Sequence, residues 1–314
     1  MHSTERSNLL SEETIKRLSQ INAKKTTMII VSEWASICVI ILLCNLFFHW
    51  YTYILTVVFV GARQHALGVL MHDGVHGRLY KNKKLNDSIA ELCLASLLFF
   101  PMRTYREQHL THHANVNTNQ DPDWVYLTKH PKFAKEWFFP MSPAKLCFYL
   151  SKNLFGLNTV RMMKLLYKQN TKRSKHNTSW DFLDYTKLGL YLSGILLLTY
   201  FQGWQVFFMY WLVPMITWFS FSNRIRIIAD HFANQNENEY NMSRTTYLNL
   251  FERIFIGLHN ISYHLDHHLY PSVPFYNLKK LHGSLLEHQI YQDKAHITKS
   301  YWGVLKECVG QSLR

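Results

Sequence analysis

Four long apolar runs stand out along the chain, and they come in two pairs. The first pair covers residues 28–49 and 52–71, and the second covers 185–202 and 204–222. Glu33 is the one charge of the first run, and Arg63 is the one Lys or Arg of the second. A spanning helix needs ~20 mostly apolar residues. The pattern therefore predicts an all-α integral membrane protein whose four transmembrane helices form two hairpins.

A fifth apolar segment, Ile89–Phe100, is too short to span a bilayer. We expect it to form a re-entrant or interfacial hairpin that ends at Pro101. An ordinary buried helix is the alternative, and apolarity alone does not separate the two.

The distribution of basic residues predicts the orientation of these helices. The chain has 34 Lys+Arg against 21 Asp+Glu, a formal net charge of +13. The connections after Trp50 and at Gln202–Gly203 contain no Lys or Arg, whereas five lie in residues 1–27, seventeen between His72 and Thr186, and ten after Phe221. The positive-inside rule places residues 1–27, 72–184 and 223–314 in the cytoplasm. We expect one membrane domain over residues 1–314, in a bacterial inner membrane or the endoplasmic reticulum.

Residues 129–175 alternate lysines with aromatic residues such as Phe133, Trp137 and Phe148. This alternation is typical of helices that lie on a membrane face and direct Lys and Arg toward lipid headgroups. Proteins that bind single-stranded nucleic acid also interleave basic and aromatic residues. Because predicted spans flank the segment, we expect membrane lipids as its partner and no nucleic acid.

Eight of the 18 histidines fall in three five-residue windows, each next to a predicted span end and on the cytoplasmic side. Within each window the histidines are spaced at i, i+4 or at i, i+3, i+4, which places them on one face of a helix. Neutral imidazole is the commonest metal ligand, and facing helices can pool their ligands. Three such faces supply more ligands than one ion takes, so the pattern predicts a dimetal site. The windows are His72–His76, His109–His113 and His264–His268.

The ligand type narrows the choice of metal. Imidazole suits zinc, copper, iron and nickel. A zinc hydrolase site usually stops at about three protein ligands plus water. Eight or more imidazoles favour two irons, which can reduce dioxygen with supplied electrons; zinc stays as the alternative.

The sequence around these windows resembles the membrane fatty acid desaturase superfamily from about Gly61 to Leu278. Four stretches carry the resemblance: GARQHALGVLMHDGVHG, HLTHHANVNTNQDPDW, RIRIIADHF and NISYHLDHHLYPSVPFYNL. The resemblance implies a four-span bundle under a cytoplasmic helical cap that holds a non-haem di-iron centre. It also implies nine metal ligands, namely His72, His76, His109, His112, His113, His231, His264, His267 and His268.

The resemblance and the chemistry of ligating histidines also indicate residues around the metals. Carboxylates beside a ligating imidazole can accept its second N–H, so Asp73 and Asp266 are candidates, with ion pairs to Arg or Lys as the alternative. Asp121 and Asp123 could do the same, or could cap the turn at Pro122. Arg63 could reach the membrane interface or be held by residues around the centre.

One position departs from the family pattern. Some members have an asparagine four residues before the isolated ligand, where it contacts the metal through water, but this chain has Ile227 there. Asn260, four residues before His264, is the substitute candidate. We expect His231, and not His65, to be the ninth ligand, because His65 lies about 10 Å deeper along its helix than His72.

The resemblance implies an enzyme that uses dioxygen to oxidise an unactivated C–H bond, with no catalytic residue beyond the metal centre. Fatty acyl desaturation is the leading hypothesis. A hydroxylase or ketolase of a lipid, carotenoid or small amine substrate is the alternative, and a metal-binding membrane receptor is the non-enzyme alternative. Because the chain shows no fused electron-carrier domain, a separate ferredoxin or cytochrome b-type protein with its reductase should donate electrons.

Overall fold

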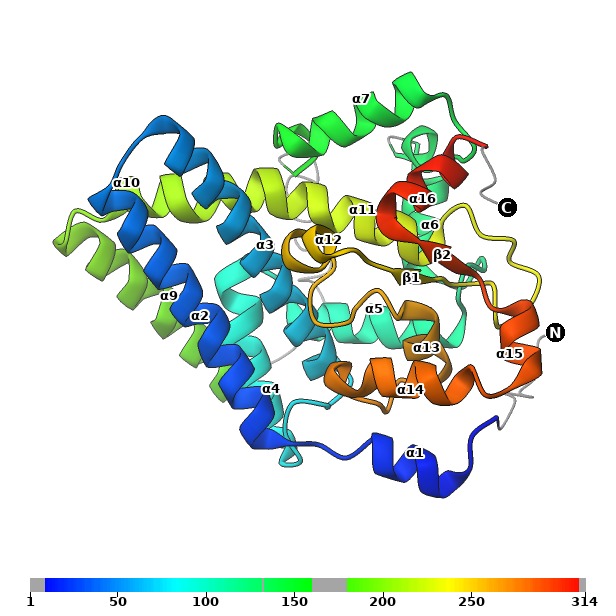
Figure 1. Ribbon diagram of the computed structural model, residues 1–314. Coiled ribbons are helices and arrows are strands. Elements are labelled where there is room, and N and C mark those ends of the chain that lie inside the picture. Colours follow the sequence, from blue (N-terminus) through cyan, green and yellow to red (C-terminus); the bar gives the residue numbers. More distant parts are fainter. Residues whose placement is uncertain (1–8, 132, 160–179, 311–314) are drawn as a thin grey trace.

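The computed structural model describes residues 9–131, 133–159 and 180–310, and this part of the chain is mostly helical. Its two longest helices, α2 (Ala23–Leu46) and α3 (Trp50–Val75), lie side by side as a hairpin (Figure 1). Both are long and apolar enough to cross a membrane. The first predicted pair of spanning helices is therefore present.

Both helices extend beyond the predicted bounds, α2 at its start and α3 at its end. α2 begins at Ala23, earlier than the expected 28, because the Asn22 side chain caps the helix by accepting the backbone N–H of Lys25 at 2.9 Å. α3 continues past the expected residue 71 to Val75, and His76 is its C-cap. His72 is therefore fully helical, and His76 follows it by one turn.

The second predicted pair is also helical, but it is less regular. α9 (Phe182–Tyr200) has two charged residues, Asp184 and Lys187, in its first turns, so its apolar part is short. The next helical stretch runs without a break from Trp204 to His231 and contains two π-helical segments, which widen its turns. Its parts are α10 (Trp204–Phe207), η4 (Phe208–Leu212), η5 (Met215–Phe219) and α11 (Ser220–His231).

The segment expected to form a hairpin ending at Pro101 bends sharply. Two helical arms, Lys83–Leu98 and Met102–Ala114, meet at 102°, and together they add at most one more membrane crossing. Phe99, at the bend, has a left-handed backbone with φ 56°. Ala90 and Leu94 are fully buried, so the first arm also has the character of a packed helix. The arms consist of α4 (Lys83–Ser88), η1 (Ile89–Ala95), η2 (Ser96–Leu98) and α5 (Met102–Ala114).

The remaining elements gather on one side of the helical hairpins (Figure 1). They include two three-residue strands, β1 (Thr245–Tyr247) and β2 (Ile297–Lys299), which pair in parallel and correct the all-α expectation. The strands are too short to give an alternating pattern, which is why the sequence did not reveal them. The helices are α1 (Glu12–Leu18), α6 (Pro122–Lys129), η3 (Ala134–Glu136), α7 (Pro143–Leu154), α12 (Leu250–Phe255), α13 (His264–Leu269), η6 (Phe275–Asn277), α14 (Leu278–Leu285), α15 (Gln289–Lys294) and α16 (Ser300–Cys308).

The aromatic residues of 129–175 that the structure describes divide between core and surface. Phe133 and Trp137 are buried, and the Trp137 ring packs on Phe232 at 4.8 Å between centroids. Phe148 on α7 is 60% exposed, as a membrane-facing residue would be. Residues 132 and 160–179 of this segment lie outside the described part of the chain.

Replacing Gly61 with Ala should destabilise the protein, because α3 crosses η5 closely at this position. A Cβ at Gly61 would lie 2.7 Å from the Cβ of Trp218 and 3.0 Å from the backbone nitrogen of Phe219. Overpacking of this kind costs about 1–3 kcal/mol. Thermal melts in detergent should therefore show a lower midpoint for Gly61→Ala.

Gly68→Ala is the matched control on the same helix. A Cβ at Gly68 would meet its nearest atom, in Phe219, at 3.8 Å. Alanine also favours a helix over glycine, so the midpoint should stay equal or rise. Equal losses in both variants would contradict the close crossing at Gly61.

Candidate metal centre

Nine histidine side chains converge where α3, α5, α11 and α13 meet. Eight come from the three windows, and the ninth is His231, the last residue of α11. The helices explain the convergence, because each window is helical and points its histidines to one side. The structure thus brings together every histidine that the sequence singled out as a ligand.

The first histidine set contains five imidazoles whose ligand atoms all lie within 4.8 Å of one another. The Nε2 atoms of His76 and His109 are 2.9 Å apart, those of His109 and His113 are 3.0 Å apart, and those of His113 and His267 are 3.2 Å apart. The His72 ring lies 4.4 Å from the His109 ring between centroids. The set is His72, His76, His109, His113 and His267.

The second histidine set contains the other four imidazoles. His112, His231 and His268 have ligand atoms within 4.8 Å of one another. His264 joins them, because its Nε2 lies 3.0 Å from that of His231 and 3.2 Å from that of His268. The Nε2 atoms of His112 and His231 are 3.2 Å apart.

Helix geometry explains how the windows divide between the sets. Residues four apart on a helix differ by about 40° in direction, so both members of each i, i+4 pair belong to one set. The histidine that lies three residues after the first one of a window points in a different direction and belongs to the other set, as His112 and His267 do. The helices α5 and α13 therefore each contribute to both sets.

The distances between ring nitrogens fit shared metal ions. Two nitrogens about 2.1 Å from one ion and at right angles are about 3.0 Å apart, whereas a tetrahedral angle separates them by about 3.4 Å. The six Nε2–Nε2 contacts of the two sets measure 2.9–3.2 Å. The spacing therefore suits ions with more than four ligands.

Burial keeps these imidazoles in the form that binds metal. It lowers the pKa of His109, His264 and His267 well below the ordinary histidine value, and neighbouring imidazoles lower it further. Neutral imidazole has a free nitrogen lone pair for a cation. Both ring nitrogens of buried His72 lack a hydrogen-bond partner, an arrangement that costs free energy unless another group supplies one. The residues present therefore fit two metal ions.

Asp121 performs both of the roles considered for it. Its Oδ2 lies 2.8 Å from Nδ1 of His112, which leaves Nε2 of that ring facing the second set. Its Oδ1 accepts the backbone N–H groups of Asp123 and Trp124 and so caps α6. The Asp123 side chain forms a close group with His112 and Asp121.

The two carboxylates inside the windows hold neighbouring segments and do not pair with ligating imidazoles. Asp73 accepts the backbone N–H of Phe275 at 2.9 Å and lies 4.0 Å from Nδ1 of His72, too far for a hydrogen bond. This contact ties α3 to the segment after the third window.

Asp266 instead anchors α13 through residues outside the two histidine sets. It accepts the hydroxyl of Tyr291 at 2.7 Å and that of Thr245 at 2.8 Å, and it lies 3.1 Å from Nδ1 of His282. The sequence analysis expected Asp266 to contact a metal-ligating imidazole or to pair with Arg or Lys. Its partners are instead Tyr291, Thr245 and His282.

Arg63 and Asn260 have their contacts elsewhere. Arg63 pairs with Glu33 of α2 at 3.3 Å, and His259 contacts the same carboxylate at 3.0 Å. Asn260 donates its side-chain N–H to the carbonyl of Phe275 at 3.1 Å. An ion pair between two neighbouring helices was not among the roles expected for Arg63.

His65 lies outside both histidine sets. Its Nδ1 is 2.7 Å from the carbonyl oxygen of Ile256, and its ring packs near Phe219. This contact joins α3 to the end of α12 within the helical bundle. His231, the other candidate for the ninth ligand, belongs to the second histidine set.

The structure adds two residues that the sequence analysis missed. Asp230 places a carboxylate oxygen 3.7 Å from Nε2 of His264 and 3.1 Å from Nε of Arg226. The position of Asp230 directly before His231 was the signal in the sequence that could have indicated it. Fully buried Arg244 donates to the carbonyls of Ala229 and Phe232 at the end of α11, and no local pattern indicates that contact.

Comparison with known proteins agrees with this geometry. The family model described as "Fatty acid desaturase" matches residues 48–301, a range that includes all nine converging histidines. The chain is 29% identical over 287 residues to a dihydrorhizobitoxine desaturase of Bradyrhizobium elkanii, and the match covers 86% of this chain and 78% of that protein.

Other relatives are desaturases of chloroplasts and of cyanobacteria. A chloroplastic omega-6 fatty acid desaturase of Spinacia oleracea is 25% identical, over 82% of this chain and 58% of its own length. A protein of Nostoc named sn-1 acyl-lipid omega-3 desaturase (ferredoxin) is 26% identical, over 77% of this chain and 70% of its own length. Since the family model covers most of the chain, this protein belongs to the fatty acid desaturase family and is an oxidoreductase.

Proposed function

We propose that the protein desaturates an acyl chain, using dioxygen and external electrons, at a non-haem di-iron centre. The observation that supports this most directly is the convergence of nine imidazoles into sets of five and four. The first set would hold one iron and the second set the other. When bound, the two irons would supply the ability to reduce dioxygen and oxidise an unactivated C–H bond.

The composition of the two sets favours iron over zinc. Structural zinc takes four ligands, and catalytic zinc takes about three plus water, so a set of five imidazoles exceeds both. Iron accepts imidazole ligands and changes oxidation state, as the proposed reaction requires.

The surrounding residues would orient the imidazoles and exclude water. Asp121 accepts a hydrogen bond from Nδ1 of His112, which assigns the proton to that nitrogen and leaves Nε2 free for a metal. Burial of His109, His264 and His267 keeps competing water and protons away from the ligand atoms. The protein would thus position the substrate and shield the centre, while the cofactor performs the oxidation.

The names of the relatives support desaturation over hydroxylation, although the two reactions can share all ligands. One relative is named for dihydrorhizobitoxine, and the other two are named for fatty acids or acyl-lipids. We propose an acyl chain as the substrate because most of these names specify one. The name of the Nostoc protein includes ferredoxin, which supports a separate electron donor for this chain.

We also propose that all four predicted segments cross the membrane and that the histidine sets face the cytoplasm. The unbroken helical stretch from Trp204 to His231 is long enough for a crossing at about 1.5 Å per residue. The basic residues outside the apolar runs support the orientation.

The product should be an unsaturated acyl chain. Cells that produce the protein should accumulate a desaturated fatty acid, detected by mass spectrometry of their lipids, and cells that produce the His268→Ala variant should not. The conversion should require oxygen. Only hydroxylated or ketone products would overturn the proposed desaturation.

Removing one ligand from either set should reduce the iron content from about two ions per chain to about one or fewer. His113→Ala tests the first set, and His268→Ala tests the second. His65→Gln is the control, because His65 binds a backbone carbonyl outside both sets. Elemental analysis of purified protein measures the iron directly. Full iron content in the first two variants, or a loss only in the control, would contradict the assignment.

Asp121→Asn should weaken metal binding by about 10–100-fold, as expected when a partner of a ligating imidazole is lost. Asparagine caps helices as well as aspartate does, so α6 should persist. Asp123→Asn is the paired variant, since the cap needs only the backbone of Asp123. Chelator competition measures the affinities. Equal affinities for both variants would show that Asp121 has only a capping role.

A further inference from the structure

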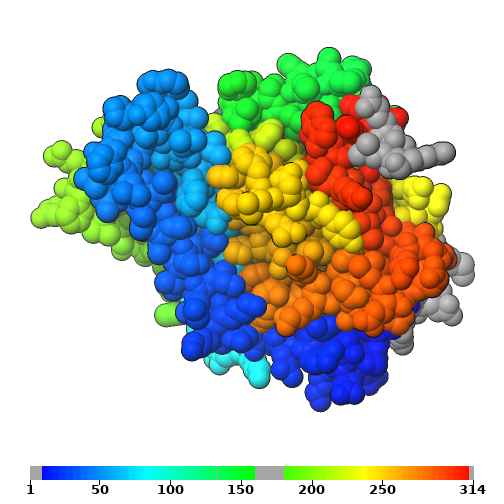
Figure 2. Space-filling model, viewed as in Figure 1, coloured from blue at the N-terminus to red at the C-terminus, as the bar shows by residue number. Residues whose placement is uncertain are grey.

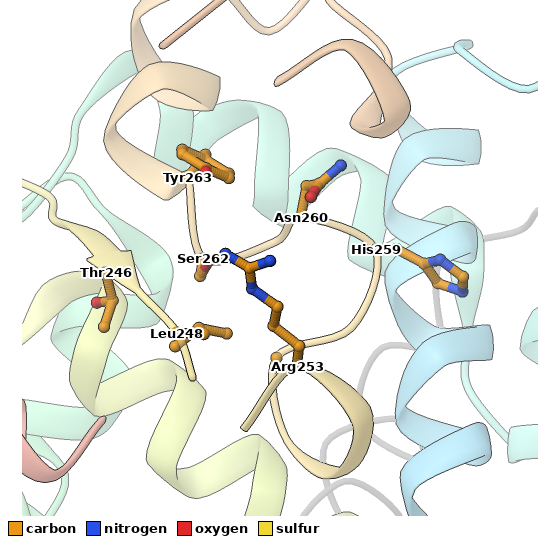
Figure 3. Close-up of a pocket in the computed structure, with 8 residues that line it drawn as sticks. Thr246, Leu248, Arg253, His259, Asn260, Ser262 and Tyr263 are labelled. Atoms are coloured by element: carbon orange, nitrogen blue, oxygen red, sulfur yellow. The ribbon is translucent and has the colours of Figure 1, made fainter. Parts of the chain in front are cut away.

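A pocket outside the histidine sets lies between β1, α12 and the loop that leads into α13. Its volume is about 110 Å³. The walls include Thr246, Arg253, His259, Asn260 and Ser262, and Figure 3 shows the Arg253 side chain extending between Asn260 and Ser262. None of the roles described above uses this space.

The pocket offers hydrogen-bond donors and no acid. Among the described residues Arg253 has no ion pair, and no Asp or Glu lines the walls. Thr246 and Ser262 add hydroxyl groups, and their backbones are joined by a 2.8 Å hydrogen bond from Thr246 N to Ser262 O. An unpaired guanidinium beside two hydroxyls suits an anion.

The loop geometry turns the His259 side chain out of the pocket. His259 and Asn260 both have left-handed backbones, with φ 54° and 58°. This turn directs the His259 ring away from the pocket centre (Figure 3), to Glu33 of α2 at 3.0 Å. Glu33 is thereby occupied by His259 and Arg63, and Arg253 remains free for a ligand.

The helix that carries Arg253 also exposes an apolar face. Leu250, Phe251 and Ile254 lie within one turn of α12 and are 74%, 54% and 37% exposed. α12 packs beside α3 and η5, since Arg63 of α3 donates to the carbonyl of Ile254 and Trp218 of η5 donates to that of Phe255. Figure 2 shows this region (gold) at the surface beside the blue hairpin of α2 and α3. A short helix with an apolar face and a basic edge beside a spanning helix is typical of the membrane interface.

We propose that this pocket binds the phosphate of an anionic membrane phospholipid. Arg253 would bind the phosphate oxygens through its guanidinium, and Ser262 and Thr246 would donate their hydroxyl hydrogens to it. The acyl chains of the lipid would lie against Leu250 and Phe251. Gly257, which also lines the pocket, leaves no room for a Cβ because Leu248 and Tyr301 pack closely on it.

Calorimetric titration of the purified full chain in a neutral detergent tests this proposal. The probes are dihexanoyl phosphatidylglycerol, uncharged dioctanoylglycerol and inorganic phosphate. Phosphatidylglycerol should bind most tightly, and Arg253→Gln should weaken its binding by about tenfold or more. Arg17→Gln is the matched control, because Arg17 is exposed on α1, far from α12 in Figure 1, and should change the affinity less than twofold.

Each other result counts against the proposal. If Arg253→Gln and Arg17→Gln lost the same affinity for phosphatidylglycerol, binding would reflect only the general positive charge of the protein. Equal binding of dioctanoylglycerol would remove the role of the phosphate, and equal binding of inorganic phosphate would remove the role of the lipid. Circular dichroism and gel-filtration volume must match the wild type in both variants. Because no turnover is measured, the outcome is separate from that of the proposed desaturation.

Discussion

The convergence of nine imidazoles on two points is the constraint on which the rest of this structure depends. Each neutral ring has one N–H and one lone pair, and rings whose Nε2 atoms face one another cannot all satisfy both. The Nδ1 atoms of His264 and His268 have no hydrogen-bond partner among the described residues. The helices that carry the rings must therefore hold these nitrogens in place.

The surrounding polar residues hold the helices in place. Most of them contact the backbone or neighbouring side chains, and not the converging imidazole rings. Asp73 ties α3 to the segment after the third window, and Asp266 fixes α13 against Tyr291 and Thr245. Arg244 binds the last carbonyls of α11 and so fixes the turn after His231. Asp121 in addition holds a ring directly, through Nδ1 of His112. The site is rigid because its helix ends are anchored.

The convergence of the histidines within each window was predictable because its signal is local. Spacing of three and four residues within each window predicts a common helical face, and apolar length predicts α2 and α3. Contacts between distant residues left no such signal. Arg63 needs Glu33, and β1 needs β2 about fifty residues later, so neither the ion pair nor the sheet followed from any single segment. Periodicity also cannot tell that Phe133 and Trp137 pack on Phe232 and not on lipid.

The anchoring of the second histidine set by late residues has a consequence for biosynthesis. His112 is made early, but the turn after His231 relies on Arg244, which in turn pairs with Glu307 at 2.8 Å. Likewise α13 rests on Tyr291 and on a strand that pairs with Ile297–Lys299. Until Ile297–Lys299 and Glu307 have been made, these supports are incomplete. The second histidine set is therefore anchored only after residues up to Glu307 have been made.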